Sequence, residues 1–528
     1  MLYRIITIVV LTLFLPDVIP GVGGTSDKTP ADRKIVLIAG PKSHGPGEHE
    51  YIKSVRLIKT LLDNSNVKGI RTEIHLDGWP IDESTLNDAD LILFTSDGRD
   101  GELYANVPFM QPGRIEVIEK QMKRGCGLSL LHFSTFASDD YGAKVLEWGG
   151  GYFDWQDDEG KRNWYSSIKT IKAEVQIVRA GSPVSNGVKP FVINEEFYYN
   201  IRFKTQDKRV KPVLQVSDLK GNSTNGNVVA WTIERQDGGR GFCTTMGHYF
   251  SNWEQADYRK LQLNGIVWAA GAKVPANGVE TVFYSDKQVT EHLSGKKRKA
   301  LILTGNHHPM HPWQKTTPLI RKSIAESGNF FVDVSTNIED LAQYQLTDYD
   351  LLVMNYCNWE DPRQLSERSK TSFVDYLEKG GGLIIIHFAN GAFHKSLPGA
   401  GSSDWPEYRK ICRRIWDHDS NSSHDPYGTF TVKISPLAHP ATAGIKDFNT
   451  TDELYFNQKG DEPVVPLITA RSQKTGKEEP LAWAYNYGKG RIFQTLLGHN
   501  EKSIEASEVK QLLGQAAIWC ATKTDSKE

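Results

Sequence analysis

The chain has 528 residues, 39% of them hydrophobic and 24% charged, which is typical of soluble globular protein with roughly two to four domains. Its 62 basic and 64 acidic residues give a net charge of −2, so no basic excess points to nucleic acid or anionic membrane as a partner. Five cysteines occur without a CxxC or Cys/His zinc spacing, and we expect them to be buried small side chains.

Residues 1–24 have the pattern of a cleavable secretory signal peptide. Arg4 supplies a positive charge, and an apolar run of 11 residues follows at 5–15. This run is too short to cross a hydrocarbon layer of ~30 Å but suits a signal peptide. We therefore expect a secreted or periplasmic protein without stable membrane insertion after cleavage. An uncleaved N-terminal anchor is the alternative.

A first domain at residues 33–275 is predicted from apolar strands that alternate with amphipathic helices, a pattern typical of a parallel sheet covered on both faces. The strands are expected near 35–40, 71–76, 89–96 and 128–132, and the helices near 51–62 and 114–125. A long stretch of hairpin-like strands follows, and a late strand at 241–247 and a helix at 258–271 close the domain.

A charged segment at 285–299, expected to be an exposed linker, leads into a second domain at 298–524. This domain repeats the first in four segments that keep their order. GLSLLHF at 127–133 returns as GLIIIHF at 382–388, NEEFYYN at 194–200 as TDELYFN at 451–457, RKIVLIAG at 33–40 as RKALILTG at 298–305, and Arg240 with Gly-His at 247–248 as Arg491 with Gly-His at 498–499. Solenoid repeats have periods of roughly 20–50 residues, so this much longer period indicates two complete domains.

Paired histidines follow the strands of both predicted sheets. In open α/β sheets ligands bind at the carboxyl ends of the strands, so we expect these side chains to share one edge. The pairs are His44 and His308 after the first strand, His132 and His387 at the end of the fourth, and His248 and His499 at a Gly-His turn after the late strand.

The segments around these histidines carry a family resemblance. They are AGPKSHGPGEHEY (39–51) and TGNHHPMHPW (304–313), the strand ends HFS and HFA, the pairs EEFYY and DELYF, RGFCTTMGH and RIFQTLLGH, and the middle region 405–432. On these residues the chain resembles the ThuA-like (trehalose utilisation) family, once in each half. The resemblance implies an α/β fold of two tandem flavodoxin-like, class I glutamine-amidotransferase-like domains, with a mainly parallel sheet flanked by helices. It also implies a role in disaccharide breakdown through 3-keto sugars.

One departure from the amidotransferase relatives bears on mechanism. Their nucleophilic cysteine follows the fourth strand, where this chain has His132-Phe133-Ser134 or His387-Phe388-Ala389. A thiolate mechanism needs a cysteine with a base within reach, so we reject it. Ser134 has no counterpart in the second half, which argues against a serine nucleophile as well.

Six residues are therefore our catalytic candidates: His132, Glu196 and His248 in the first half, and His387, Glu453 and His499 in the second. The strand-end histidines could instead bond a loop carbonyl. Adjacent acids point opposite ways along a strand, so only one of Glu195 and Glu196 can face the cleft. The glutamate kept in both halves is our choice for a general base or metal ligand, and a solvated turn acid is the alternative.

A loop with His307, His308 and His311 suggests a divalent metal site, because imidazole is a common ligand. His44, Glu48 and His49 are the first-half equivalents. Hydrogen bonds from these histidines to loop carbonyls are the alternative.

Trp313, Trp359 and Trp405 are candidates for stacking on sugar rings, with core packing as the alternative. Arg240 and Arg491 are candidate substrate-binding residues that could equally close a hairpin by pairing with a carboxylate.

Together these residues predict an exported enzyme acting on 3-keto glycosides or related disaccharides. A ketone acidifies the neighbouring C–H, so Glu453 or His387 could remove that proton while His308 and His499 polarise the carbonyl. A non-catalytic carbohydrate-binding module and a metal-dependent hydrolase or lyase for another polysaccharide are the alternatives. The second half is the stronger candidate for activity because its loop holds more imidazoles.

Overall fold

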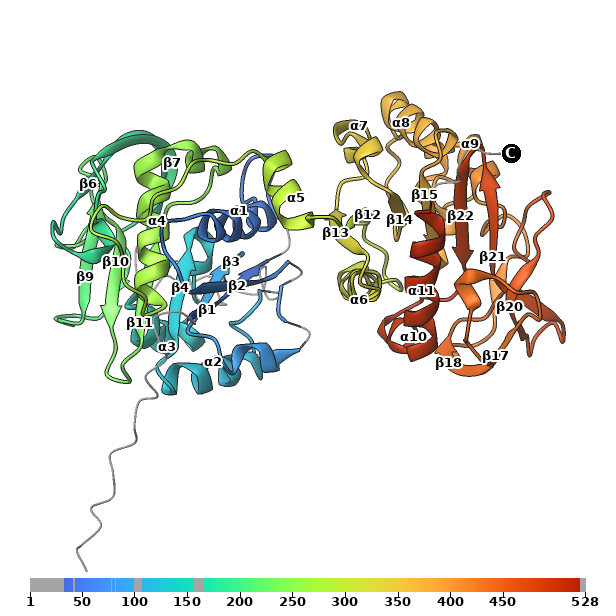
Figure 1. Ribbon diagram of the computed structural model, residues 1–528, viewed down its shortest axis with the longest axis horizontal. Helices are drawn as coiled ribbons and strands as arrows, with labels where there is room; N and C mark the ends of the chain where they lie inside the picture. The colour runs from blue at the N-terminus through green and yellow to red at the C-terminus, as the bar shows by residue number, and fades with distance from the viewer. Residues whose placement is uncertain are drawn as a thin grey trace, which may run out of the picture.

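The computed structural model describes residues 33–522 apart from 41–42, 77, 81, 99–106 and 155–165. Over these ranges the chain forms two α/β domains joined by a short helix (Figure 1). The signal peptide predicted at residues 1–24 lies outside the described residues. Within the described part, no helix has both the length and the apolar character needed to span a bilayer.

The first domain follows the predicted order of elements. Its strands are β1 (Arg33–Ala39), β2 (Ile70–His75), β3 (Leu91–Thr95), β4 (Gly127–Leu131), β5 (Gly151–Tyr152), β6 (Ser167–Ile177), β7 (Phe191–Tyr199), β8 (Arg202–Phe203), β9 (Val210–Gln215), β10 (Val228–Glu234) and β11 (Arg240–Thr244). Its helices are α1 (Tyr51–Asp63), α2 (Arg114–Lys123), α3 (Asp139–Gly149) and α4 (Ala256–Ala269).

The second domain repeats this order after the connecting helix α5 (Asp286–Ser294). Its strands are β12 (Arg298–Leu303), β13 (Phe330–Ser335), β14 (Leu351–Met354), β15 (Gly382–Ile386), β16 (Ser423–His424), β17 (Gly428–Ile434), β18 (Phe448–Asp452), β19 (Tyr455–Phe456), β20 (Pro466–Arg471), β21 (Glu478–Tyr487) and β22 (Gly490–Thr495). Its helices are α6 (Trp313–Glu326), α7 (Asp340–Gln343), α8 (Glu367–Glu378), α9 (Pro406–Ile411), α10 (Glu501–Glu505) and α11 (Ser507–Cys520).

Each domain has a mixed sheet of nine strands among the described residues, in the order β2-β1-β3-β4-β11-β10-β9-β6-β7 in the first and β13-β12-β14-β15-β22-β21-β20-β17-β18 in the second. The first five strands of each order run parallel, and the hairpin strands add four antiparallel ones. The parallel part has the flavodoxin-like strand order, with its reversal between β1 and β3. The expected α/β architecture in two tandem domains is confirmed.

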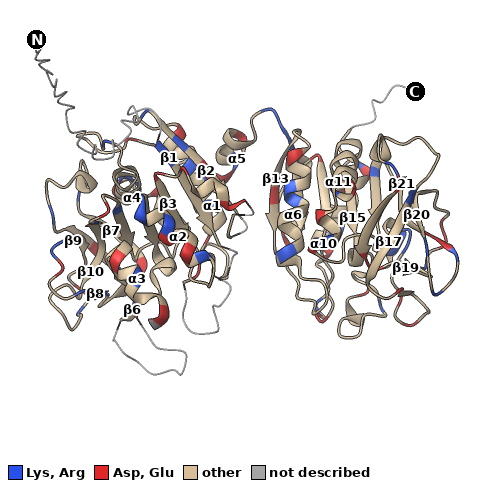
Figure 2. Ribbon diagram, turned by 90° about the horizontal axis from the view of Figure 1, so that it is seen from below, with Lys and Arg blue, Asp and Glu red and all other residues tan. Residues whose placement is uncertain are grey.

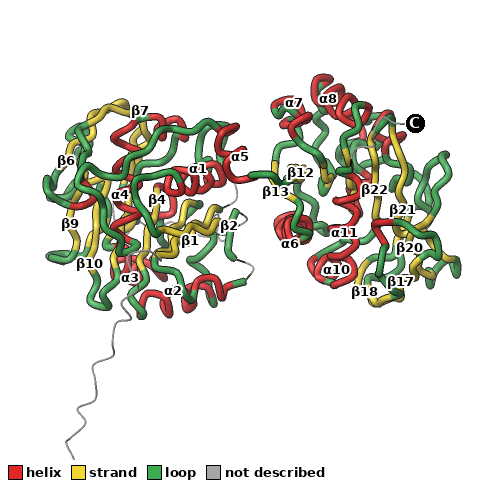
Figure 3. The backbone as a smooth tube through the Cα atoms, in the orientation of Figure 1, coloured by secondary structure: helices red, strands yellow, loops and turns green. Residues whose placement is uncertain are grey.

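Both faces of the first sheet are covered by helices, as Figure 3 shows around the strands. Ile35 and Leu37 of β1 face a core shared with α1 and α4, whereas Val36 and Ile38 face a core shared with α2 and α3. Because side chains alternate along a strand, coverage on both faces requires apolar residues at every position. This explains the uninterrupted apolar runs of the sequence.

The charged segment between the halves is more ordered than the exposed linker we expected. Ser285 and Gln288 form a reciprocal capping box that begins α5, and Val289 is buried. Lys53 and Asp63 of α1 pair with Asp286 and His292 of α5, respectively. The segment is therefore a helix that packs on the first domain. Figure 2 shows both signs of charge on both halves.

All five cysteines are buried and free, as expected. Burial raises the pKa of the Cys126 and Cys243 thiols to about 12. A thiol with such a pKa is protonated at neutral pH, which agrees with our rejection of a thiolate nucleophile.

Candidate active site

Three histidines and a glutamate converge beyond the carboxyl ends of the parallel strands in the first domain. His49 lies in the loop between β1 and α1, His132 directly follows β4, His248 follows β11, and Glu196 lies on β7. One nitrogen of each histidine and one carboxylate oxygen lie within 4.8 Å of one another. We call these four residues the first-half centre.

The second domain has the same arrangement at the repeated positions. His311 precedes α6, His387 follows β15, Glu453 follows β18, and His499 follows β22. Their ligand atoms also lie within 4.8 Å of one another. Glu453 Oε2 is 3.2 Å from His499 Nδ1 and 3.7 Å from His387 Nε2. This second-half centre joins three catalytic candidates to one of the metal candidates.

The strand-end histidines are oriented by backbone hydrogen bonds. Nδ1 of His132 donates to the carbonyl of Thr245, and Nδ1 of His387 donates to that of Leu496, both over 2.7 Å. Their Nε2 lone pairs therefore face the centres. A loop carbonyl that fixes the second nitrogen is the usual surrounding of a metal-binding histidine. One nitrogen of each ring therefore bonds a loop carbonyl, as the structural interpretation expected. The other nitrogen faces the centre, as the functional interpretation expected.

Backbone strain accompanies this placement. His49, His132 and His387 have φ values of 45°, 51° and 48°, which residues other than glycine rarely adopt. Such conformations persist only where the surrounding structure imposes them, and they cluster at functional sites.

In the first-half centre two imidazole lone pairs face each other. The hydroxyl of Tyr51 donates to Asp97 Oδ1 at 2.6 Å, so Nδ1 of His49 must donate to that hydroxyl, at 2.7 Å. Nε2 of His49 is then unprotonated, and it lies 3.1 Å from Nε2 of His132. Burial lowers the pKa of both histidines, which disfavours a shared proton. Nδ1 of His248 lies 3.0 Å from Nε2 of His49, and the hydroxyl of Tyr198 lies 2.9 Å from Nε2 of His132, so each lone pair has a possible donor nearby. The three imidazoles and the carboxylate of Glu196 are a donor set that fits a divalent metal such as zinc.

The glutamates of the two centres are held as carboxylates. Burial by itself would raise the pKa of Glu196 and of Glu453, but hydrogen bonds and charge from the neighbouring histidines outweigh it and lower both. For His248 burial lowers the pKa, and the carboxylates of Glu196, Glu195 and Glu48 together raise it above the usual value. Each centre therefore has a negative charge that favours a cation.

The adjacent acids divide their roles as the strand alternation predicts. Glu195 accepts hydrogen bonds from the backbone N–H groups of Gly247 and His248, at 2.9 and 3.1 Å. Asp452 accepts the same pair of bonds from Gly498 and His499, at 2.8 and 3.2 Å. These acids fix the Gly-His turns, while Glu196 and Glu453 face the histidines.

The glycines of these turns are required by geometry. Gly247 and Gly498 have φ values of +135° and +131°. A Cβ on Gly247 would lie 3.2 Å from His132 Cβ, and one on Gly498 would lie 2.8 Å from Ile386 Cγ2. The turn histidines can therefore approach the strand-end histidines only if glycine precedes them.

His308 lies beside the second-half centre rather than within it. Its ring centroid is 4.3 Å from that of His311. Its Nδ1 accepts a hydrogen bond from the backbone N–H of Met310 at 3.0 Å, so in the neutral ring Nε2 carries the proton. Burial lowers the pKa of His308 to about 4, which keeps the ring neutral. Nε2 is buried without a hydrogen-bond partner, so His308 is a free N–H donor.

The first-half counterpart, His44, presents a hydrogen-bond acceptor where His308 presents a donor. Its ring lies on that of His49 with centroids 3.6 Å apart. Ser43 Oγ donates to Asp97, so His44 Nδ1 donates to Ser43 and leaves Nε2 as an acceptor. His44, His49 and Asp97 form a further group with ligand atoms within 4.8 Å. The remaining metal candidate, His307, is exposed and belongs to none of these groups.

Two of the three tryptophans lie near the second-half centre. Trp359 packs its ring 4.5 Å from that of His308 and 5.1 Å from that of His418. Trp313, with His311, His387 and His499, lines a cavity of about 30 Å³ at the centre, which is room for an ion or a water molecule. Trp405 is buried and stacks on Tyr408, so it is part of the core.

The arginine candidates lie at the other end of the sheet. Arg240 is the first residue of β11 and Arg491 the second of β22, whereas the centres lie beyond the last residues of these strands. Each guanidinium donates to a carbonyl in the closing helix, Trp268 or Trp519, and lies over the same residue's ring. The substrate-binding role expected for them is inconsistent with these positions, because a helix-anchoring contact occupies each side chain.

The sequence analysis missed several residues around the centres. Tyr198 and Tyr455 lie 2.9 Å from the Nε2 atoms of His132 and His387, and their repetition in EEFYY and DELYF could have identified them. Asp97 and Tyr51 also went unnoticed, since their role depends on contacts across the fold. His424 Nδ1 is 3.6 Å from Glu453 Oε1.

Comparison with known proteins places both halves in one group. The sequence model of the ThuA family, described as trehalose utilisation, matches residues 36–269 and again 299–520. A ThuA-like protein from Parabacteroides merdae is 26% identical, with a TM-score of 0.37 over 44% of this chain and 93% of that chain. A ThuA-like protein from Bacteroides uniformis is 18% identical, with a TM-score of 0.34 over 43% and 93%. No curated protein matches the sequence.

Proposed function

The chain belongs to the ThuA (trehalose utilisation) family, and from this premise we propose that it is an exported enzyme that cleaves 3-keto glycosides. The repeated centre of three histidines and one glutamate, whose ligand atoms lie within 4.8 Å of one another, carries the proposal. The catalysed step is an elimination at a sugar carbon next to a ketone.

His311, His387 and His499 are the residues that would hold a divalent cation in the second half. Three protein ligands with an open position are typical of catalytic rather than structural sites. When bound, such an ion supplies Lewis-acid stabilisation of negative charge on a substrate oxygen.

The remaining side chains supply the proton chemistry. Glu453 accepts the proton from C2 of the sugar, and the electron pair moves onto the C3 oxygen. The N–H of His308 donates a hydrogen bond to that oxygen as its charge develops. The returning electron pair forms a C1=C2 double bond while the bond from C1 to the glycosidic oxygen breaks. The departing oxygen takes up a proton, which gives an alcohol and an unsaturated keto sugar. Addition of water across the double bond would complete a net hydrolysis.

Glu453 is favoured over His387 as the base for a geometric reason. His387 has both nitrogens committed, one to the carbonyl of Leu496 and one to the centre. Glu453 has a carboxylate oxygen on each side, near His424 and near His499. A carboxylate can therefore face a substrate while the imidazoles keep their positions.

The test is incubation of the protein with 3-keto-trehalose, with and without added Zn²⁺, Mn²⁺ or Ca²⁺. We expect release of the second sugar and, in D₂O, deuterium at C2 of recovered substrate. Glu453→Gln should abolish both, even in protein saturated with the ion that supports wild-type turnover. The exposed Glu462→Gln serves as the matched control. Absence of release and of exchange under all ion conditions would exclude this function.

One observation favours a non-catalytic carbohydrate-binding protein instead. The cavity at the second-half centre is only about 30 Å³, so an ion there could be purely structural. Glycan binding that persists in the double variant His132→Ala and His387→Ala, without turnover in the wild type, would support this alternative.

Export is the part of the proposal that depends on residues 1–24. Mass spectrometry of the mature N-terminus after expression with the native leader tests it. A product that still starts at Met1 would count against a cleaved signal peptide.

A further inference from the structure

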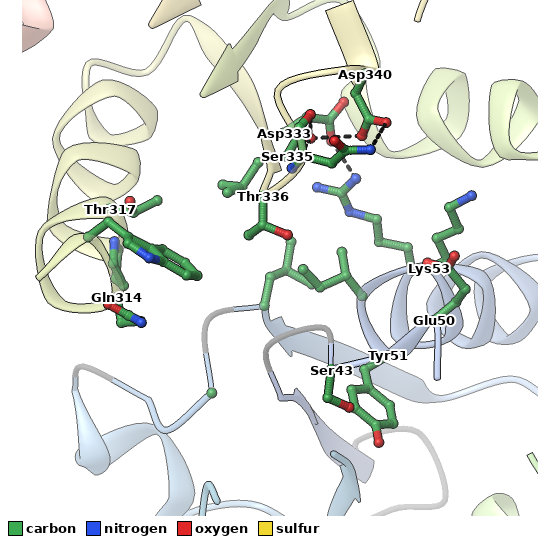
Figure 4. Close-up of a pocket in the computed structure, with 18 of the residues that line it drawn as sticks. Ser43, Glu50, Tyr51, Lys53, Gln314, Thr317, Asp333, Ser335, Thr336 and Asp340 are labelled. Atoms are coloured by element: carbon green, nitrogen blue, oxygen red, sulfur yellow. Dashed lines mark hydrogen bonds and ion pairs between the residues drawn. The ribbon is translucent and has the colours of Figure 1, made fainter. Parts of the chain in front are cut away.

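A cavity of about 1080 Å³ lies between the two domains (Figure 4). Ser43, Tyr51 and Lys53 line it from the first domain, and Gln314 and Thr336 line it from the second. Ligand pockets in proteins usually have volumes of roughly 300–1,000 Å³, so this chamber can hold more than one sugar ring.

The chamber reaches the side chains that contact both centres. His44 and Tyr51 line its first-domain wall, and both contact His49 of the first-half centre. On the opposite side, His308 and Trp313 line the chamber and also the small cavity at the second-half centre. Each centre is therefore separated from the same chamber by a single layer of side chains.

An ion pair between the domains fixes this arrangement. Arg56 of α1 pairs with Asp333 of β13, and the side chains are only 12% and 8% exposed. The guanidinium also lies over the ring of Phe331 at 5.1 Å, and Tyr349 donates to Asp333 at 2.8 Å. Separating the domains would break this pair and expose both charged side chains to water together with the ring of Phe331. This pair therefore holds the two walls of the chamber in a defined position relative to each other.

The chemistry of the walls suits a polyhydroxylated ligand. Two indoles line the chamber and offer apolar ring surface to sugars: Trp313, and Trp79, over whose ring the Arg114 guanidinium lies at 5.4 Å. The side chains of Gln314, Asn337 and Gln343 offer amides for hydroxyl groups. Charges of both signs line the chamber, including Lys53 and Glu50, so a strongly anionic or cationic ligand is not favoured. We propose that this chamber binds a glycan of two or more sugar units, and that a single bound glycan contacts the side chains that border both centres. Only the idea that bound sugar is then cleaved rests on the proposed function.

The experiment measures binding of trehalose and maltotetraose to the full-length, metal-loaded protein by calorimetry. Thr290→Trp fills the chamber from the connecting helix, and we expect it to raise the Kd of the glycan that binds at least tenfold. Trp79→Ala and Gln314→Ala remove one contact from each wall, and each should raise the Kd several-fold. Metal content should stay at the wild-type value in all three variants. Ser217→Trp, at an exposed position outside the chamber, is the control and should bind as the wild type does.

The outcomes separate this inference from the proposed function. Binding that Thr290→Trp weakens, in a protein that never cleaves a 3-keto sugar, supports the chamber and removes the enzyme proposal. Wild-type binding in all three chamber variants overturns the chamber, even if turnover is observed. Failure of the wild type to bind either glycan overturns it as well. Should Thr290→Trp fail to fold, the two single-contact variants still decide the question.

Discussion

The two centres share four residues and differ in the side chains packed around them. In the first half, His44 is tied to Ser43 and Asp97 and presents an acceptor. In the second half, His308 presents a buried N–H without a partner, and the segment 355–358 that follows β14 has no carboxylate. The duplication thus kept the three histidines and the glutamate while the neighbouring hydrogen-bond donors diverged. Under the proposed function, this difference makes the second half the one that stabilises a developing oxyanion.

The two halves should differ most in how the loss of the strand-end histidine changes kcat. His387→Ala should lower kcat for a 3-keto disaccharide by about 10²–10⁴, because it removes a ligand next to the reacting atoms. His132→Ala should change kcat less than about threefold, since its half lacks the free N–H donor. Steady-state kinetics of both variants and the wild type measure how much each half contributes to kcat. Equal losses would show that the halves are equally active.

Metal content should be the same in the two halves, in contrast to their effect on kcat. We expect two equivalents of divalent metal per chain in the wild type and one in either single histidine variant. Tyr198→Phe and Tyr455→Phe remove a hydroxyl that lies next to the Nε2 atoms of His132 and His387 and competes with a cation for their lone pairs, so the metal affinity of the centre that carries the substitution should not fall. Elemental analysis and competition with a chelator measure both quantities. A single equivalent of metal in the wild type would show that one of the two centres does not bind metal.

The Gly-His turns should differ in stability cost. Alanine at Gly498 or Gly247 forces a residue with Cβ into a left-handed conformation, at about 1–3 kcal/mol. The closer contact at Gly498, 2.8 Å against 3.2 Å, should make Gly498→Ala the more destabilising of the two. Thermal unfolding compares them. Gly444→Ala is the control, because Gly444 has a φ of +73° and an added Cβ would meet only Gln511 Nε2 at 4.0 Å, so this variant measures the cost of the backbone conformation without a steric clash.

The smallest effect concerns pH. The raised pKa of His248 means that its proton competes with a cation up to a higher pH than usual. The first-half centre should therefore lose its ion as the pH falls through this raised pKa. Glu48 Oε1 lies 3.7 Å from His248 Nε2, and Glu48→Gln should lower the pKa and move the release midpoint downward. The side chain is 39% exposed, so the shift should be roughly a few tenths of a pH unit. An upward shift would contradict this electrostatic account.

Much of the site could be predicted because repetition marks it. His132 and His387 end matching apolar strands, and the rule that ligands bind at the carboxyl ends of strands placed them with His248 and His499. Strand alternation showed that only one of Glu195 and Glu196 can face the cleft, and Glu196 was chosen because the second half keeps a glutamate at that position. Arg240 and Arg491 repeat just as well, but they lie at the start of their strands and not after the end. Repetition therefore indicates that a position is important to the fold. Whether its side chain can reach a ligand depends on whether it lies at the start or after the end of its strand.

Apolar periodicity and the direction of the chain are enough to predict the two α/β domains, their order of elements and the sheet edge at which the histidines gather. The three-dimensional structure was needed to show which loop histidine joins each centre, which ring nitrogens of His49, His132 and His387 carry a proton, and that side chains next to both centres line one chamber. These features depend on hydrogen bonds and packing between residues far apart in the chain, such as His49 with His132 and Arg56 with Asp333. Local sequence patterns carry no information about such distances.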